Sequence, residues 1–133
     1  MTADPAPRHQ SRERALTLLY EADLKGESPT AVLEALPMAP DPYVTTLVSA
    51  VTDRKATIDT LVGDAAIGWD LSRMAVVDRN VLRLATAELL VCGDVPTAVI
   101  LDEAVELASS FSTDDSGRFV NGVLATVAAA VRS

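Results

Sequence analysis

The chain has few of the residue types on which several classes of protein depend. Its 133 residues include one cysteine, Cys92, and one histidine, His9. A single cysteine cannot form an intrachain disulfide, and one cysteine with one histidine cannot supply a zinc site of the usual kind. Because Cys92 lies in an apolar helical stretch, a buried, inert thiol is favoured over a nucleophile. The shortage of cysteine also predicts a cytoplasmic location.

Aromatic residues and long apolar runs are scarce as well. Aromatic residues make up 4% of a chain that is 49% hydrophobic, so alanine, valine and leucine must form a core that suits closely packed helices. No apolar run approaches the roughly 20 residues needed to cross a bilayer, and the N-terminus has no apolar signal segment. The sequence contains neither GxxxxGK[ST] nor GxGxxG. These features offer little that points to catalysis, and we expect no cofactor, no metal and no segment that enters a membrane.

Positive charge is in short supply, but it is unevenly distributed. The formal net charge is -8, which argues against a general nucleic-acid binder. Residues 1–20 nevertheless carry a net charge of +1, whereas residues 85–133 carry -5. One end could therefore meet an anion while the other meets a cationic partner. Ordinary solvated faces are the alternative interpretation of the same charges.

The apolar spacing predicts an all-α domain of six or seven helices in one unit, residues 1–133. Two N-cap and proline pairs, Ser28-Pro29 and Asp41-Pro42, predict helix starts. Residues 1–10 are expected to form a flexible, basic segment. The expected helices cover residues 12–25, 30–36, 43–62, 71–74, 76–91, 96–111 and a final stripe that ends near residue 131.

The run FSTDDSGRFVNGVL, residues 111–124, could be a metal loop or a helix start. A calcium loop of the EF-hand type needs a glutamate at its twelfth position, but counting from Asp114 gives an alanine. A helix start fits better, because Ser112 or Thr113 can cap it and the acids favour the positive end of the helix dipole. Ser112-x-x-Asp115 resembles a capping box. Two acids and an arginine are still more polar surface than a cap requires.

Four stretches in order resemble one known family. Residues 94–124, DVPTAVILDEAVELASSFSTDDSGRFVNGVL, look like the C-terminal signature of the NusB family of transcription antitermination factors. Residues 8–24, 43–51 and 76–90 resemble its arginine-bearing first helix, its central helix and its fifth helix. Together these stretches cover most of the chain.

The resemblance implies a fold, a function and a set of residues. It implies two packed, small helical subdomains without enzymatic activity. It also implies pairing with NusE, a protein of the small ribosomal subunit. The pair would bind the BoxA element of single-stranded RNA within the transcription complex, notably in ribosomal RNA transcripts. Some members are homodimers, and this possibility stays open. The matching RNA-binding positions are Arg8, His9, Arg12 and Arg14. The matching partner-binding positions are Tyr20, Asp78, Asp115, Arg118 and Phe119.

The same residues allow other interpretations. A basic patch this thin, with Glu13 inside it, predicts weak RNA binding without the partner. Tyr20 and Phe119 fit the core equally well, Asp115 fits a helix cap, and Trp69 is expected to fill the core between the subdomains. Two other functions remain. One is a stand-alone relative of the RNA-binding domain of ribosomal RNA methyltransferases. The other is a self-associating helical scaffold.

Overall fold

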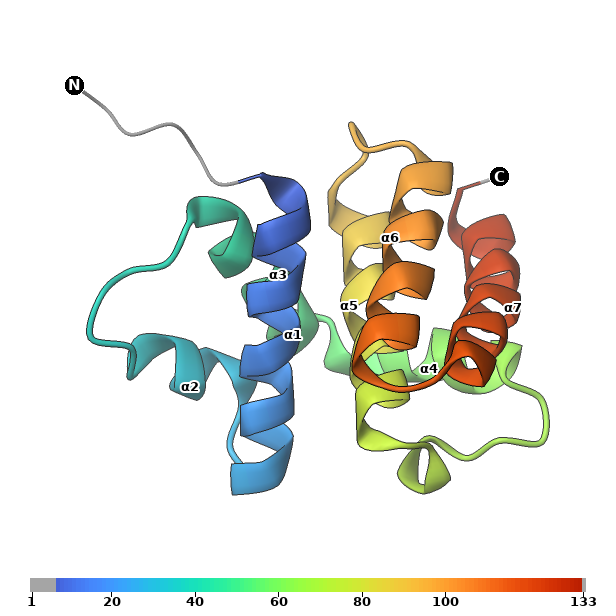
Figure 1. Ribbon diagram of the computed structural model, residues 1–133, viewed down its shortest axis with the longest axis horizontal. Coiled ribbons are helices and arrows are strands. Elements are labelled where there is room, and N and C mark those ends of the chain that lie inside the picture. The colour runs from blue at the N-terminus through green and yellow to red at the C-terminus, as the bar shows by residue number, and fades with distance from the viewer. Residues whose placement is uncertain (1–6, 133) are drawn as a thin grey trace.

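The computed structural model describes residues 7–132 and is all-helical in that range (Figure 1). This confirms the predicted fold class. Among these helices, none combines the length and hydropathy that a bilayer-spanning segment needs. The α-helices are α1 (Arg8–Lys25), α2 (Pro29–Glu34), α3 (Pro42–Asp53), α4 (Lys55–Ala65), α5 (Val76–Val91), α6 (Thr97–Phe111) and α7 (Asp114–Val131), with a 3-10 turn at Leu71–Arg73 before α5.

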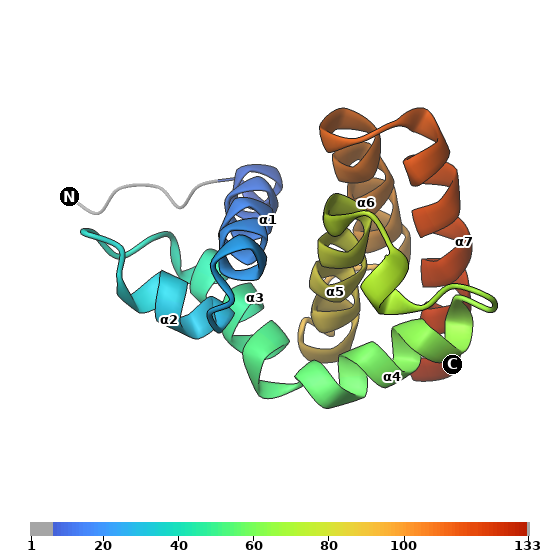
Figure 2. The same cartoon turned by 90° about the horizontal axis from the view of Figure 1, so that it is seen from below.

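The helices form two groups that share α5 as their common support. Helices α1, α2 and α3 pack together on one side, and α4, α6 and α7 pack around α5 on the other (Figures 1 and 2). Helix α5 contacts α1 and α3 as well as α4, α6 and α7. The buried apolar side chains of both groups form one continuous cluster, built largely from alanine, valine and leucine. The expectation of two packed helical subdomains is confirmed.

Polar side chains also join α5 to both helical groups. The guanidinium of Arg79 and the amide of Asn80 donate to Asp23 of α1 at 2.8 and 3.0 Å. Burial raises the pKa of Asp23, but these hydrogen bonds and the charges of Arg79 and Arg83 outweigh it and lower that pKa overall. Arg83 forms two hydrogen bonds with Asp59 of α4. These bonds fix the rotation of α5 between the two groups.

Local signals place most helix ends where the sequence predicts them. Ser28 and Asp41 each accept a hydrogen bond from a backbone N–H of the helix that follows, and a proline occupies the first helical position in both cases. Asp70 caps the 3-10 turn by accepting from the N–H of Ser72. Gly26 ends α1 with φ of 67°, a left-handed conformation that glycine adopts without a steric penalty.

The predicted helix over 43–62 is wrong as a single element, because the chain breaks it at Arg54. That residue has φ of -114° and ψ of 21° and separates α3 from α4. Helix α3 packs on α1 and α2, whereas α4 packs on α5 and α7. The chain therefore turns to pass from one group to the other, at an exposed position that carries neither glycine nor proline.

The expected flexible segment over residues 1–10 is also partly wrong. Helix α1 begins at Arg8, and the N–H of Ser11 already bonds the carbonyl of Pro7 at 3.1 Å. Arg8 and His9 are thus presented from a helix. Residues 1–6 lie outside the described part of the chain.

Candidate functional site

The first turn of α1 carries Arg8 and His9, and carboxylates already meet both. The guanidinium of Arg8 lies 3.3 Å from Asp94 and 4.7 Å from the ring centre of Tyr43. The ring of His9 lies between Glu103, 2.8 Å from Nδ1, and Glu13, 3.1 Å from Nε2. Arg8 is exposed and its ion pair is a surface pair, so a phosphate can compete for it.

The surroundings of His9 favour its charged form. The hydrogen bond with Glu103 is the main cause, and the charges of Glu103, Glu13 and Glu106 add to it, so the pKa of His9 is raised from its ordinary value of 6.5 despite an opposing desolvation effect. Ligand atoms of His9, Glu103 and Glu106 come within 4.8 Å of one another. Both ring nitrogens face carboxylates, so the charged imidazolium can donate to Glu103 and Glu13 at the same time.

Arg12 lies inside the protein, which is at odds with the expectation that it faces RNA. Its side chain is 4% exposed and that of Glu88 on α5 is 1% exposed. The Nε and Nη2 atoms of Arg12 donate to this carboxylate at 2.6–3.1 Å, and the hydroxyl of Tyr43 donates to it at 2.5 Å. Burial disfavours the charged guanidinium, but the bond with Glu88 outweighs it and raises the pKa of Arg12. Arg12 therefore joins α1 to α5.

Arg14 is the residue of this set that is most available to a ligand. It is exposed on α1, and no carboxylate within residues 7–132 pairs with it. The basic surface of α1 thus consists of Arg14, of Arg8, whose ion pair with Asp94 can be exchanged, and of His9 in its charged form. Acids lie against the last two. This end of α1 is close to charge-balanced, which fits the predicted weak affinity for RNA.

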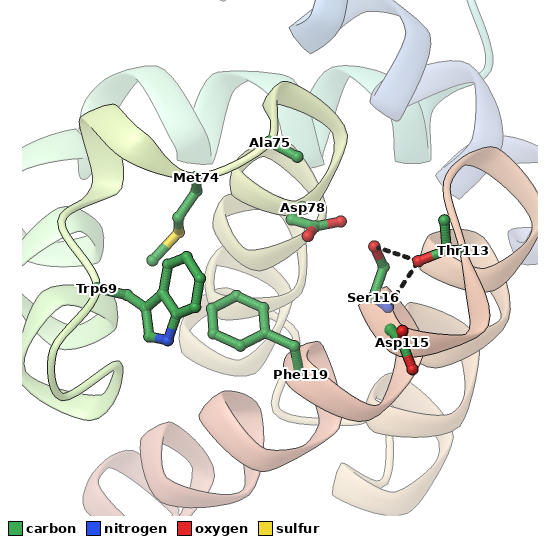
Figure 3. Close-up of a pocket in the computed structure, with 8 residues that line it drawn as sticks. All are labelled: Trp69, Met74, Ala75, Asp78, Thr113, Asp115, Ser116 and Phe119. Carbon is green, nitrogen blue, oxygen red and sulfur yellow. Dashed lines mark hydrogen bonds between the residues drawn. The ribbon is translucent and has the colours of Figure 1, made fainter.

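Three of the five expected partner residues border one pocket (Figure 3). It lies at the starts of α5 and α7, at the opposite end of the molecule from the start of α1 (Figure 1). The pocket has a volume of about 230 Å³ and lies between the start of α5, the start of α7 and the loop that precedes the 3-10 turn. Asp78 enters it from α5, and Asp115 and Phe119 enter from α7. The remaining lining residues are Trp69, Met74, Ala75, Thr113 and Ser116.

The other two expected partner residues lie outside this pocket. Tyr20 is 40% exposed and borders a second pocket of about 240 Å³, formed with Leu16, Thr17, Val77 and Phe111. Arg118 is exposed on α7 and pairs with Asp115. Tyr20 is therefore not a plain core residue, whereas Phe119 is half-buried and packs against the core.

The acidic run Asp114-Asp115 begins α7 as expected, with one correction to the cap. The hydroxyl of Thr113 accepts from the N–H of Ser116 at 3.1 Å, so Thr113 is the N-cap. The proposed capping box from Ser112 to Asp115 is wrong, because Ser116 holds the third helical position and the hydroxyl of Ser112 instead accepts from the hydroxyl of Ser116. Asp114 and Asp115 lie in the first turn, where the helix dipole favours negative charge.

Sequence reasoning missed the surface position of two aromatic residues. Trp69 was expected in the core but is 55% exposed, and its ring contacts that of Phe119. Phe111, the last residue of α6, is 45% exposed. A signal for Trp69 exists in the sequence, since Gly68 and Asp70 are turn residues on either side of it. The end of α6 similarly leaves Phe111 at the edge of the core.

Comparison with known proteins gives consistent matches over nearly the whole chain. Residues 9–129 match the NusB family. A Saccharopolyspora erythraea protein named Transcription antitermination protein NusB is 50% identical over 127 residues, which cover 91% of this chain and 86% of the relative. A protein of the same name from Acidothermus cellulolyticus is 48% identical over 126 residues, which cover 92% of this chain and 87% of the relative.

Solved structures agree with the sequence relatives. The structure of T. maritima NusB superimposes with a TM-score of 0.86 at 35% identity and covers 95% of this chain and 93% of that one. A chain from a crystal structure of antitermination factors NusB and NusE in complex with dsRNA superimposes with a TM-score of 0.79 at 28% identity. That match covers 92% of this chain and 96% of the other.

Proposed function

Because this chain belongs to the NusB family of transcription antitermination proteins, we propose that it pairs with NusE and that the pair binds BoxA RNA. The observation that carries the proposal is that α1 presents two different surfaces at different points along its length. Its first turns carry Arg8 and Arg14, while Tyr20, farther along the same helix, borders the second pocket. The solved complex of NusB, NusE and RNA, to which this fold is similar, supports an arrangement with both partners.

The RNA face is formed by Arg14, Arg8 and His9. Arg14 offers a guanidinium that no carboxylate of residues 7–132 pairs with, and it can contact phosphate or stack on an unpaired base. Arg8 can exchange its surface pair with Asp94 for a phosphate. Arg12 contributes indirectly, because its bond with Glu88 holds α1 against α5 and so positions the first turn.

The partner completes the RNA site. Asp94, Glu13 and Glu103 lie beside the cations of α1 and weaken the local attraction for phosphate. A basic ribosomal protein that docks near Tyr20 and the Asp78 pocket, and extends along α1 toward its first turn, adds the missing positive charge. Complementary charge also speeds the encounter with that protein, because acids border the pocket that receives it.

Fluorescence anisotropy with a BoxA-like single strand and a scrambled strand tests this function. Each RNA is titrated at two salt concentrations, with and without purified NusE. We expect selective binding that strengthens with NusE and weakens with salt. Arg14→Ala is expected to weaken the salt dependence. The magnitude of the slope of log K against log salt should fall by about 0.7, the value for one phosphate contact on a single strand. Arg73→Ala, which removes an exposed cation from the 3-10 turn, is the matched control.

The outcomes separate the alternatives. Equal affinity for both strands, or binding by this chain alone as tight as that of the pair, contradicts the proposal. If Arg73→Ala weakens binding as much as Arg14→Ala, the attraction is a general charge effect rather than a defined face. Light scattering on the same samples separates a monomer from a homodimer, and a homodimer that excludes RNA favours the scaffold alternative.

A further inference from the structure

The guanidinium of Arg8, in the first turn of α1, lies over the ring of Tyr43 on α3. Its central carbon is 4.7 Å from the ring centre, within the range of a cation–π contact. One edge of the guanidinium pairs with Asp94 at 3.3 Å, and the Arg8 side chain is 48% exposed. The group therefore has an aromatic ring on one side and a carboxylate at one edge, while much of its surface faces solvent.

The ring of Tyr43 is a fixed support rather than a mobile surface side chain. It is half-buried against the core, and its hydroxyl donates to the buried carboxylate of Glu88 at 2.5 Å. Burial is the main cause that raises the pKa of Tyr43, so the hydroxyl keeps the proton that this bond needs. Arg12 holds the same carboxylate from α1. The ring under Arg8 is thus anchored to the carboxylate that joins α1 to α5.

These contacts prepare Arg8 for a planar ligand. An exposed arginine loses rotamer freedom when it binds, and a side chain that is already held in place loses less. A phosphate needs the N–H edge of the guanidinium and has to compete with Asp94 for it. A flat ring needs the face of the group instead, and stacking on that face leaves the ion pair in place. Unpaired nucleobases stack on arginine in this way.

We propose that Arg8 and Tyr43 form a stacking subsite for one unpaired base of the RNA, an inference that rests on the function proposed above. The base lies on the outer face of the Arg8 guanidinium, and the ring of Tyr43 supports the inner face. Arg8 contacts the base, and Tyr43 is a positioning residue that acts through Arg8. Because every base has a flat π-face, the subsite adds affinity for a single strand without selecting a particular base.

Arg8→Lys tests the flat group without changing the charge. Lysine keeps one positive charge at this position but has no plane on which a base can stack. In anisotropy titrations of the pair with NusE and the BoxA-like strand, we expect affinity to fall about tenfold. The slope of log K against log salt is expected to stay unchanged, because the number of cations is the same. Arg73→Lys, the same change at an exposed position of the 3-10 turn, is the matched control and is expected to have no effect.

Two variants of Tyr43 separate its ring from its hydroxyl. Tyr43→Phe keeps the ring and loses the bond to Glu88, so we expect lower stability but RNA affinity close to that of wild type. Tyr43→Leu also removes the ring and is expected to weaken RNA binding several-fold, again with an unchanged salt slope. Thermal melts establish that each variant is folded at the temperature of the titrations. If phenylalanine weakens RNA binding as much as leucine, the ring is not the support and the proposal is overturned.

Abasic nucleotides identify the base that stacks on Arg8. An abasic nucleotide keeps its phosphate and lacks the base, and it is placed at each position of the strand in turn. We expect one position at which loss of the base weakens binding to wild type about tenfold but has little further effect with Arg8→Lys. A strand with 2-aminopurine at that position is expected to lose fluorescence on binding to wild type, because stacking quenches this base, and to keep it with Arg8→Lys.

The outcomes keep this subsite separate from the proposed function. Selective binding of the BoxA-like strand with equal affinity for wild type and Arg8→Lys overturns the subsite and leaves the function in place. An abasic series in which no position depends on Arg8 has the same meaning. A loss of affinity that comes with a smaller salt slope assigns Arg8 to phosphate alone and also overturns the stacking. Absence of RNA binding by the wild-type pair overturns both proposals.

Discussion

Arg12 of α1 and Glu88 of α5 form a buried ion pair across 76 residues of sequence. Two guanidinium nitrogens donate to the carboxylate, and the hydroxyl of Tyr43 on α3 donates to the same group. Three helices therefore meet at one carboxylate. A buried pair of this kind is costly to break, because the remaining charge has lost both its partner and its water.

Arg12→Met is expected to lower the free energy of unfolding by about 3–5 kcal/mol, because it leaves the charge of Glu88 buried and unpaired. Urea denaturation followed by circular dichroism measures this change. Arg14→Met on the same helix is the control, and as an exposed position it is expected to change stability by less than about 0.5 kcal/mol.

A second variant separates the buried charge from simple packing. Combining Arg12→Met with Glu88→Leu removes both charges, and we expect most of the lost stability to return. A double variant as unstable as Arg12→Met alone would mean that shape rather than charge matters at this position. RNA binding by the folded double variant close to that of wild type would agree with an indirect role for Arg12.

The burial of Arg12 shows where sequence reasoning stops. Its neighbours Arg8 and Arg14 are exposed. Helical spacing places Arg12, three and four residues before Ala15 and Leu16, on the buried stripe of α1, but this spacing does not say which acid would pair with it. The missing information is Glu88, an acid within the apolar run of α5 that needs a cation once buried. Pairing the two requires knowing that α1 packs on α5. The break between α3 and α4 at Arg54 also depends on tertiary packing, because α3 packs in one helical group and α4 in the other.

Features fixed by neighbouring residues were predictable. The caps at Ser28 and Asp41 depend on residues two or three positions away, and the spacing of apolar residues depends on the helix itself. The pocket residues Asp78, Asp115 and Phe119 came from resemblance to the family rather than from physical reasoning. Trp69 was misplaced because large apolar residues are usually buried, and this one lies on a loop at the rim of a pocket.

Thr86→Val is expected to stabilise the protein by about 1 kcal/mol. Thr86 is fully buried on α5, and its hydroxyl has no hydrogen-bond partner among the described residues. Valine keeps the shape and removes the unmatched polar group. Thermal unfolding measures the gain. The same change at Thr126, which is exposed on α7, serves as the control and is expected to give no gain. An equal effect at both positions would point to helix propensity instead.

Thr113→Ala tests which residue begins α7. Loss of the bond from the N–H of Ser116 is expected to cost about 1 kcal/mol. Ser112→Ala is the matched control, because Ser112 bonds a side chain rather than the free N–H groups of the helix, and its cost is expected to be smaller. Denaturation of both variants gives the comparison. The reverse order would make Ser112 the effective cap in solution.

The interaction of His9 with Glu103 predicts a specific dependence of stability on pH. Because the folded-state pKa of His9 is raised above 6.5, its charged form stabilises the folded state. This contribution is fully present below 6.5, where the unfolded state is also protonated. It declines as pH rises above 6.5 and is lost once pH passes the folded-state pKa. The groups that face His9 from α1 and α6 are Glu13, Glu103 and Glu106.

His9→Gln isolates this effect, since His9 is the one histidine of the chain. We expect the variant to be less stable than wild type at about pH 5.5 and to approach it at about pH 8.5, as the wild type loses the charge. Thermal melts across this range measure the difference. Glu103→Gln removes the main cause of the shift, so adding His9→Gln to it should produce a flatter difference curve. A difference that stays constant with pH would show that His9 acts through packing and that its charge does not couple α1 to α6.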